Sequence, residues 1–318
     1  MNSMLFPSAE RYPLVDRPPQ LFRLKTEPGG HPLWMWRDDP DGFAFGGNKV
    51  RFYECLLPVI LREKPDVIVT SGSPYSNHIR VTAEVCSRLG IGCRLLITAD
   101  PPAEGLPSGV NNLTIAASLG AVIEYIGSFA AMLRIAEYSR ALSESGLKVY
   151  TVPNAGHTPQ AASAFADVIA SALMTLDGYG VAPERVFIPC ASGTSMTGLL
   201  AGSAVLSAAG VSTPRITGIA VGNTPAGCRK GIGRLLRAAS AILPGCPDSA
   251  DADVSDGGCA YGDATHEQLA LRSSVIESEG VILDRTYNTP AFFGALKALE
   301  ESPGDSPALY INTGGFPG

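Results

Sequence analysis

The stretch DVIVTSGSPYSNHIRVTAEVCSRLG, residues 66–90, carries the clearest structural signal in this chain. Its first part, residues 66–72, is a β-branched run that ends in turn residues, and this pattern predicts a strand. Residues 78–90 place apolar side chains at helical spacing and end on a glycine, so they predict a helix. The stretch therefore predicts a strand, a loop and a helix in succession.

The same alternation repeats on the carboxyl side of this stretch. The pattern predicts further strands at residues 92–98, 121–126, 147–153, 185–193, 215–222, 281–284 and 308–315. It predicts the intervening helices at residues 110–120, 130–146, 159–176, 194–210, 266–280 and 289–301. Alternating elements of this length imply mainly parallel sheet with helices on both faces. We expect an α/β protein with two lobes, the first inserted between an N-terminal stretch and the rest of the chain.

Two segments lack this regularity. Residues 1–47 are rich in proline and aromatic side chains, and residues 38–42, DDPDG, predict a turn. Residues 244–263 are acidic and rich in glycine, proline and serine, which predicts a long connection and not a packed element. Long connections inside compact domains often carry function.

The composition excludes several classes of protein. The chain has 318 residues, 45% of them hydrophobic and 17% charged, which is enough apolar material for one or two domains. The net charge is -6 and no basic cluster stands out, so nucleic acid is not an expected partner. The N-terminus shows no signal pattern, and no apolar run approaches the roughly 20 residues of a membrane helix. We therefore expect a cytoplasmic protein.

The cysteine and histidine patterns argue against disulfides and metal sites. The seven cysteines are an odd number without a C-x-x-C pair, so they are interpreted as reduced, mostly buried residues. The four histidines are scattered along the chain. We therefore expect no metal site.

A glycine turn follows the predicted strand at residues 185–193. The sequence CASGTSMTG, residues 190–198, opens the next helix and supplies the candidates Ser192, Gly193, Thr194, Ser195 and Thr197. Free backbone N–H groups, hydroxyls and the helix dipole would together hold an anion such as phosphate. The alternative is an ordinary strand-to-helix turn, because the motif lacks the G-K-[ST] ending of a nucleotide P-loop.

The loop inside the opening stretch is a second candidate. Ser71, Ser73, Ser76 and Asn77 follow a predicted strand, so they should gather at the carboxyl end of the sheet, where ligands bind in open α/β folds. The alternative is that Ser76 or Asn77 only caps the next helix. The spacing alone does not separate the two interpretations.

Lys49 is the third candidate, in the sequence FAFGGNKVRFYE, residues 43–54. A lysine on a loop is ordinarily a solvated surface charge. Near a phosphate site, however, an amine whose pKa is lowered by desolvation or by a positive neighbour, here Arg51, can form an imine with a cofactor aldehyde. Lys49, the Ser76 loop and the Ser192 loop would then share the ligand edge of the sheet, which is the layout of a pyridoxal phosphate (PLP) site.

Five motifs together resemble a known family. They are GGNKVR (46–51), SGSPYSNHIRVTA (71–83), ASGTSMTGLLAG (191–202), EGVILDRTYNTPAFFGAL (279–296) and NTGGFPG (312–318). In this order they are similar to motifs of the 1-aminocyclopropane-1-carboxylate (ACC) deaminase and D-cysteine desulfhydrase family. The resemblance implies the tryptophan synthase β-like fold, PLP fold type II, with two open α/β domains. It implies a large PLP-binding domain of residues 1–51 and 157–318, and a small α/β domain of residues 52–156.

The resemblance also assigns roles to residues. Lys49 corresponds to the Schiff-base lysine, Asn77 to the partner of the PLP hydroxyl, and residues 192–198 to the phosphate cup. The active-site serine and the two active-site tyrosines correspond to Ser76, Tyr261 and Tyr287. Asn288 and Thr313 are placed near the pyridine nitrogen, and the expected substrate contacts are Ser73, Tyr75, Ser76, Asn77 and His78. Taken alone, either tyrosine fits a half-buried packing residue better than an active-site residue.

The chain departs from the family at four positions. Tyr75 stands where glutamine is common, Ser73 where glycine is common, and Phe52 where lysine is common. Asn288 stands where ACC deaminases have an acidic residue that faces the pyridine nitrogen. Because Asn288 or the Thr313 hydroxyl offers only a neutral hydrogen bond, the electron sink is shallower and β-elimination is better supported than opening of a cyclopropane ring.

The implied activity is that of a PLP-dependent deaminating lyase. A small amino acid would displace Lys49 from the cofactor, lose a proton and a β substituent to yield a 2-keto acid and ammonia, or open a strained ring. Two alternatives stay open: a β-replacement synthase that adds a second nucleophile, and a PLP-binding protein without catalysis. The resemblance suggests a homodimer.

Overall fold

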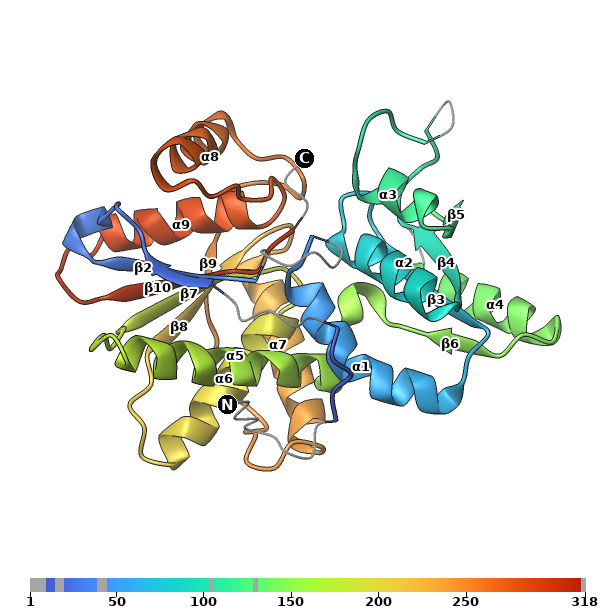
Figure 1. Cartoon of the computed structure of the whole chain (residues 1–318), viewed down its shortest axis with the longest axis horizontal. Coiled ribbons are helices and arrows are strands. Elements are labelled where there is room, and N and C mark those ends of the chain that lie inside the picture. Colours follow the sequence, from blue (N-terminus) through green and yellow to red (C-terminus); the bar gives the residue numbers. More distant parts are fainter. Residues whose placement is uncertain (1–9, 15–19, 39–44, 103–105, 128–130, 316–318) are drawn as a thin grey trace.

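The computed structural model of the protein describes residues 10–14, 20–38, 45–102, 106–127 and 131–315. Two separate sheets organise the fold, and Figure 1 shows them side by side with α1 (Asn48–Glu63) between them. The expected α/β class is confirmed. The strand ends that carry the candidate residues, however, belong to two sheets and not to a single one.

The larger sheet has six strands in the order β1-β2-β10-β7-β8-β9. Only β1 and β2 pair antiparallel; the other neighbours are parallel. The bounds are β1 (Gln20–Arg23), β2 (Leu33–Arg37), β7 (Arg185–Cys190), β8 (Arg215–Ala220), β9 (Asp253–Asp256) and β10 (Ala308–Asn312).

The smaller sheet has four parallel strands in the order β5-β4-β3-β6. The bounds are β3 (Val67–Gly72), β4 (Gly92–Ile97), β5 (Val122–Tyr125) and β6 (Val149–Thr151). All six residues of β3 are buried, which is what covered faces demand of a central parallel strand.

Helices cover both faces of the larger sheet. In Figure 1, α8 (His266–Glu279) and α9 (Asn288–Glu300) lie on one face, and α5 (Pro159–Asp177), α6 (Thr194–Ala208) and α7 (Pro225–Ser240) lie on the other. The smaller sheet carries α2 (Asn77–Leu89), α3 (Asn112–Ser118) and α4 (Ala131–Glu144). Two short 3-10 turns, Pro28–Gly30 and Asn154–Gly156, complete the connections.

The alternation of side chains along β10 explains why both faces are covered. Leu309 and Ile311 belong to the core cluster that includes α5 and α6, while Ala308 and Tyr310 belong to the cluster that includes α9. Successive side chains of a strand point to opposite faces, so a strand that is apolar at every position needs a helical layer on each side.

The strand predicted at residues 281–284 is wrong. Val281 and Leu283 are buried in the core beside α9, but the segment forms no ladder with a neighbouring strand. The Leu283 carbonyl instead accepts a hydrogen bond from Arg272 Nε at 2.8 Å. Short apolar runs reveal burial, whereas a strand also needs a pairing partner, and this segment is in neither sheet.

Other elements were not predicted from the pattern. The proline-rich N-terminal segment contains β1 and β2, the segment 244–263 contains β9, and α1 and α7 were not assigned. β2 is a strand because it pairs with β10, and β9 is a strand because it pairs with β8. Both partners are distant in sequence. Of the turn predicted at residues 38–42, only Asp38 lies within the described residues.

The division into two domains stays a prediction. The strands of the smaller sheet all fall between residues 67 and 151, inside the predicted small domain, and the strands of the larger sheet fall outside it. Helix α1 runs without interruption across the predicted boundary at residue 51.

Candidate active site

Lys49 lies in the first turn of α1 and not on a loop. Its side chain is only 9% exposed, and Nζ donates a hydrogen bond to the Ala155 carbonyl at 3.0 Å. Nζ also lies 4.5 Å from the centre of the Phe52 ring. Burial lowers the pKa of Lys49 to about 7, because a desolvated ammonium is costly. An amine with a pKa near neutrality has a substantial unprotonated fraction at physiological pH, and this form can act as a nucleophile or a base.

Arg51 is not what lowers the pKa of Lys49. Its guanidinium donates to both carboxylate oxygens of Asp38, from Nε and from the NH2 nitrogen, each at 2.8 Å. Asp38 is buried and also accepts from the Trp36 indole. This bidentate pair fastens the first turns of α1 to the end of β2.

The amino end of α6 is built to hold an anion. Its N-cap is Gly193, in the left-handed region at φ 85°, and no side chain caps the helix. The hydroxyls of Ser192 and Thr194 are 3.1 Å apart, and the Ser195 hydroxyl accepts from Asn48 Nδ2 at 3.1 Å. This last bond ties the residue beside Lys49 to the α6 terminus.

Two further groups complete that terminus. His157 Nδ1 lies 2.9 Å from the Thr194 hydroxyl, and burial together with the positive charge of Lys49 lowers the pKa of His157. The Thr197 hydroxyl donates to the Gly193 carbonyl at 2.9 Å, so it holds the turn in shape from within the helix.

Asn77 opens α2, and its amide is oriented by two donors. Its Oδ1 accepts from Arg80 at 2.8 Å and from Asn112 Nδ2 at 3.3 Å. Arg80 is fully buried and donates to Asn112 as well, while Asn112 donates to the Tyr75 carbonyl at 2.9 Å. Because Oδ1 is held by donors, the Asn77 amide presents only N–H groups to other partners.

Hydroxyl groups from both lobes meet at one place. Ser73 Oγ donates to the Tyr261 hydroxyl at 3.1 Å, and Tyr261 is hydrogen-bonded to the Tyr287 hydroxyl. Ser76 caps α2 and accepts from the His78 backbone N–H. The Tyr75 ring packs edge-on against Tyr261 and is 55% exposed. Burial raises the pKa of both Tyr261 and Tyr287, so both phenols stay protonated at neutral pH.

Asn288 is the hub of a buried polar network. Its Nδ2 donates to Asp284 at 3.0 Å and to the Gly314 carbonyl at 2.9 Å, and lies 3.4 Å from the Thr313 hydroxyl. Its Oδ1 accepts from the Thr313 backbone N–H and from Tyr310. The amide is thereby engaged on both sides, and the Thr313 hydroxyl keeps its own hydrogen for another acceptor.

Asp284 is a carboxylate that the sequence patterns did not single out. It is 4% exposed and accepts from the backbone N–H groups of Tyr287 and Asn288, which caps α9. Burial raises its pKa to about 6, and the charge of Arg80 acts in the opposite direction.

His78 lies deeper than the other predicted substrate contacts. It is 1% exposed, its ring is stacked on Tyr53, and Nε2 is 2.9 Å from the Thr70 hydroxyl. Burial, with a smaller effect of Lys49, lowers its pKa to about 3. The ring is thus neutral, and its contact with a substrate stays a prediction.

The predicted site residues therefore lie together around the carboxyl ends of β3 and β7. They are Lys49, the Ser73–Asn77 loop, the α6 terminus, the two tyrosines and the Asn288 network. Sequence reasoning missed Asn48, Arg80, Asn112, His157 and Asp284. Asn48, Arg80 and Asp284 stand inside the quoted motifs, but only their tertiary contacts distinguish them from surface polar residues.

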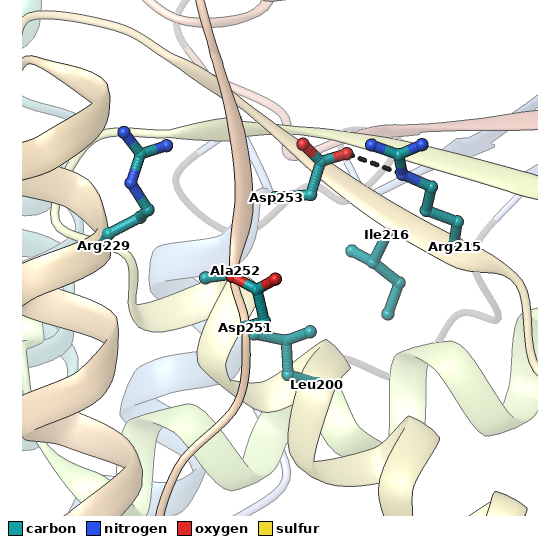
Figure 2. A pocket seen from close by; sticks show the side chains of 7 residues that line it. All are labelled: Leu200, Arg215, Ile216, Arg229, Asp251, Ala252 and Asp253. Atoms are coloured by element: carbon teal, nitrogen blue, oxygen red, sulfur yellow. Dashed lines mark hydrogen bonds and ion pairs between the residues drawn. The ribbon is translucent and has the colours of Figure 1, made fainter.

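A hollow of about 540 Å³ lies at the opposite, amino edge of the larger sheet (Figure 2). It is lined by Arg215, Arg229, Asp251 and Asp253 together with apolar side chains. Arg215 pairs with Asp253 at 3.0 Å, and Arg229 donates to the Val254 carbonyl at 3.1 Å. The hollow lies apart from Lys49, and none of the predicted site residues lines it.

Among the described residues, no group of histidine, cysteine, aspartate or glutamate side chains is arranged to hold a metal ion. Six of the seven cysteines are buried, as expected, and Cys259 is half-buried.

A buried lysine beside an uncapped helix terminus, at the edge of parallel sheets, defines a class of cofactor-dependent enzyme. Residues 15–314 match the family model described as pyridoxal-phosphate dependent enzyme, and the chain belongs to this family. It is therefore an enzyme whose cofactor is pyridoxal 5'-phosphate.

Individual relatives agree with this assignment. The 1-aminocyclopropane-1-carboxylate deaminase of Burkholderia multivorans is 28% identical, over 100% of this chain and 96% of the relative. The D-cysteine desulfhydrase of Yersinia enterocolitica is also 28% identical, over 91% and 88% of the two chains. The crystal structure of an ACC deaminase homologue superposes with a TM-score of 0.84 at 26% identity, covering 100% of this chain and 96% of that one. The resemblance in sequence and the expected PLP fold type II are confirmed.

The residues at the site fit the cofactor. The α6 terminus supplies uncapped N–H groups for a phosphate, and Lys49 supplies a buried amine. The Ser71 hydroxyl, at the end of β3, is buried and has no hydrogen-bond partner among the described residues. The α6 N–H groups, the Lys49 amine and the Ser71 hydroxyl are thus polar groups that suit the phosphate, the aldehyde and the ring substituents of the cofactor.

Proposed function

We propose that this enzyme is a deaminating lyase that eliminates a β substituent from a small amino acid and releases a 2-keto acid and ammonia. The observation that carries the proposal is the buried Lys49, whose neighbour Asn48 is hydrogen-bonded to the α6 terminus. The relatives named ACC deaminase and D-cysteine desulfhydrase support it.

Lys49 has two tasks in this proposal. Its amine would hold the cofactor through the aldehyde group, and the same amine would take the proton from Cα of the substrate. A pKa of about 7 suits both tasks, because a general base works best when its pKa is near the working pH. Pyridoxal phosphate, when bound, supplies the electron sink for the charge left on Cα.

The predicted cofactor contacts divide between the two sheets. The α6 terminus, residues 192–197, would hold the phosphate, and the N–H groups of Asn77 would face the ring hydroxyl. The Thr313 hydroxyl would donate to the pyridine nitrogen, with Asn288 holding Thr313 in place.

The substrate side would be formed by Ser76, Tyr261 and Tyr287, with Ser73 and Tyr75 at its outer edge. These hydroxyls are neutral donors, and they suit a substrate carboxylate and a departing β group.

Elimination is favoured over ring opening by the groups near the pyridine nitrogen. Thr313 is a neutral donor, and Asp284 is already occupied by the N–H groups of α9. Without a facing carboxylate the ring nitrogen is not held protonated, so the sink is shallower. A substrate with a good leaving group matches such a site.

We also propose that the enzyme is a cytoplasmic homodimer, as the family resemblance suggests. Among the helices of the described residues, none combines the length and the hydropathy needed to cross a membrane.

The test combines spectroscopy with product analysis. The protein with added cofactor should show the long-wavelength absorbance band of a lysine-bound cofactor. Lys49→Ala should lose this band, while Ser76→Ala should keep it and lose most turnover. Screening D-cysteine, ACC and β-chloro-D-alanine for release of keto acid and ammonia then identifies the substrate type. A band that persists in Lys49→Ala, or keto acid release only when a second nucleophile is added, would refute the proposal.

A further inference from the structure

A short turn before α5 contacts two parts of the site that the cofactor would join. It comprises Asn154–Gly156, and its Ala155 carbonyl accepts a hydrogen bond from Lys49 Nζ at 3.0 Å. His157 follows directly, and its Nδ1 lies 2.9 Å from the hydroxyl of Thr194 in the first turn of α6. The turn and His157 therefore reach both the buried amine and the amino end of α6.

The backbone around His157 is held on both sides. Gly156 is buried, and a Cβ at this position would lie 3.4 Å from the Phe52 ring. On the other side, the Thr158 hydroxyl caps α5. His157 is half-buried between these two anchors, so its ring approaches Thr194 from a backbone position that packing and capping determine.

The Thr194 hydroxyl has one hydrogen and three candidate acceptors for it. Besides His157 Nδ1, the Ser192 hydroxyl lies 3.1 Å away, and the proposed phosphate is the third. Burial, together with the charges of Lys49 and Arg234, lowers the pKa of His157, so its ring is neutral at neutral pH. A neutral imidazole carries its single hydrogen on Nδ1 or on Nε2, and this choice sets the direction of the bond to Thr194.

A phosphate makes the two directions unequal. If Nδ1 carries no hydrogen, the Thr194 hydroxyl donates to the ring and has only lone pairs left for the phosphate oxygens. If Nδ1 carries the hydrogen, His157 donates to the Thr194 oxygen, and the Thr194 hydrogen is left for the phosphate. Because hydrogen bonds to a charged acceptor are stronger than those between neutral groups, a bound phosphate favours the second direction.

We propose that His157 is a positioning residue for the cofactor, which donates from Nδ1 to Thr194 and so directs the Thr194 hydroxyl to the phosphate. This inference rests on the proposed placement of the phosphate at the α6 terminus. It extends the phosphate site to the connection between β6 and α5, which the sequence patterns did not single out.

The test measures how tightly the cofactor-free protein binds pyridoxal phosphate and pyridoxal, which lacks the phosphate. The ratio of the two dissociation constants isolates the contribution of the phosphate. Thr194→Val should reduce the preference for pyridoxal phosphate about tenfold, and His157→Leu should reduce it about fivefold. His157→Asn, whose amide can place an N–H near the position of Nδ1, should keep the wild-type ratio. In the Thr194→Val background, His157→Leu should have no further effect, because the two residues act through one hydroxyl.

The outcomes separate the role of His157 from the placement of the phosphate. An unchanged ratio in Thr194→Val would overturn both. A reduced ratio in Thr194→Val with a wild-type ratio in His157→Leu would overturn the role of His157 alone, and so would additive losses in the double variant. The proposed lyase activity is tested separately, by release of keto acid.

A second measurement locates the hydrogen on the ring. In protein with isotope-labelled histidine, the imidazole signal that is missing from His157→Asn identifies His157. With pyridoxal phosphate bound at about pH 8, the nitrogen chemical shifts should show the hydrogen on Nδ1. An Nδ1 without a hydrogen in the cofactor-bound protein would overturn the inference, because Thr194 would then donate to the ring.

Discussion

Lys49 shows how a side chain acquires its chemistry from its surroundings. In sequence it is one of six lysines, preceded by two glycines and an asparagine. In the fold it is buried at the first turn of α1, between the Ala155 carbonyl and the Phe52 ring. Burial lowers its pKa from 10.5 to about 7, and no neighbouring cation is needed for this shift.

This shift makes the stability of the cofactor-free protein depend on pH. Between pH 7 and 10.5 the unfolded chain keeps a proton on Lys49 that the folded protein has lost, so stability rises with pH in this window. Lys49→Met removes the buried charge. It should stabilise the protein more at about pH 6 than at about pH 9, by on the order of 2 kcal/mol.

Urea denaturation of the cofactor-free proteins at the two pH values measures this difference. Lys297→Met, at a lysine whose side chain is 65% exposed on α9, is the control variant. An equal gain from Lys49→Met at both pH values would show that the Lys49 amine is not desolvated.

At the scale of secondary-structure elements, the packing of α5 on α6 holds the amino end of α6 in place. A Cβ on Gly198 would lie 2.1 Å from the Ala162 carbonyl oxygen, and one on Gly202 would lie 2.6 Å from the Ala166 carbonyl oxygen. Both contacts are with backbone, which cannot move aside. The two glycines therefore set the separation of the helices.

Gly198→Ala should destabilise the protein by about 1–3 kcal/mol, because the added methyl group overpacks this contact. The matched control is Gly233→Ala in α7, where a Cβ would meet nothing within 4 Å. There the better helix propensity of alanine should stabilise by up to about 1 kcal/mol. The changes in the free energy of unfolding relative to the wild type, measured in urea, should have opposite signs for the two variants. A Gly198→Ala variant as stable as the wild type would contradict the close approach.

Element prediction succeeded where local signals agree with tertiary pairing. The helices at 159–176 and 266–280 were predicted closely because caps and periodicity coincide, as the Thr158 and Thr265 caps show. The run at 281–284 failed because its burial comes from α9 and not from a sheet. β9 was missed because its residues, DVSD, carry no strand signal and depend on pairing with β8.

At the scale of the whole molecule, the site belongs to neither sheet alone. Asn77 and Ser76 come from the smaller sheet's lobe, and the α6 terminus and Tyr287 come from the larger one. α1 carries Lys49 between them (Figure 1). A ligand that contacts residues of both lobes stabilises the contacted segments of each against local opening.

Adding pyridoxal phosphate to the cofactor-free protein should therefore slow amide hydrogen exchange in the first turns of both α2 and α6. These segments, residues 77–80 and 194–197, lie in different lobes but face the same proposed cofactor. Exchange in α4 and α8 should stay unchanged, because neither helix carries a proposed site residue. Protection confined to α6 would mean that the small lobe does not take part in binding.

The sequence by itself determined the α/β class, most helices, and the short list of candidate residues, because strands, caps and glycine turns are local signals. It also supported the family and the cofactor through ordered motifs. Only the tertiary structure decided that Lys49 is buried and that Arg51 pairs with Asp38. It also decided that Arg80 donates to Asn77 and that Asp284 accepts from the Asn288 backbone N–H. Desolvation and hydrogen-bond partners depend on which segments meet in space, and residues as distant as Ser73 and Tyr261 meet only when the chain has folded.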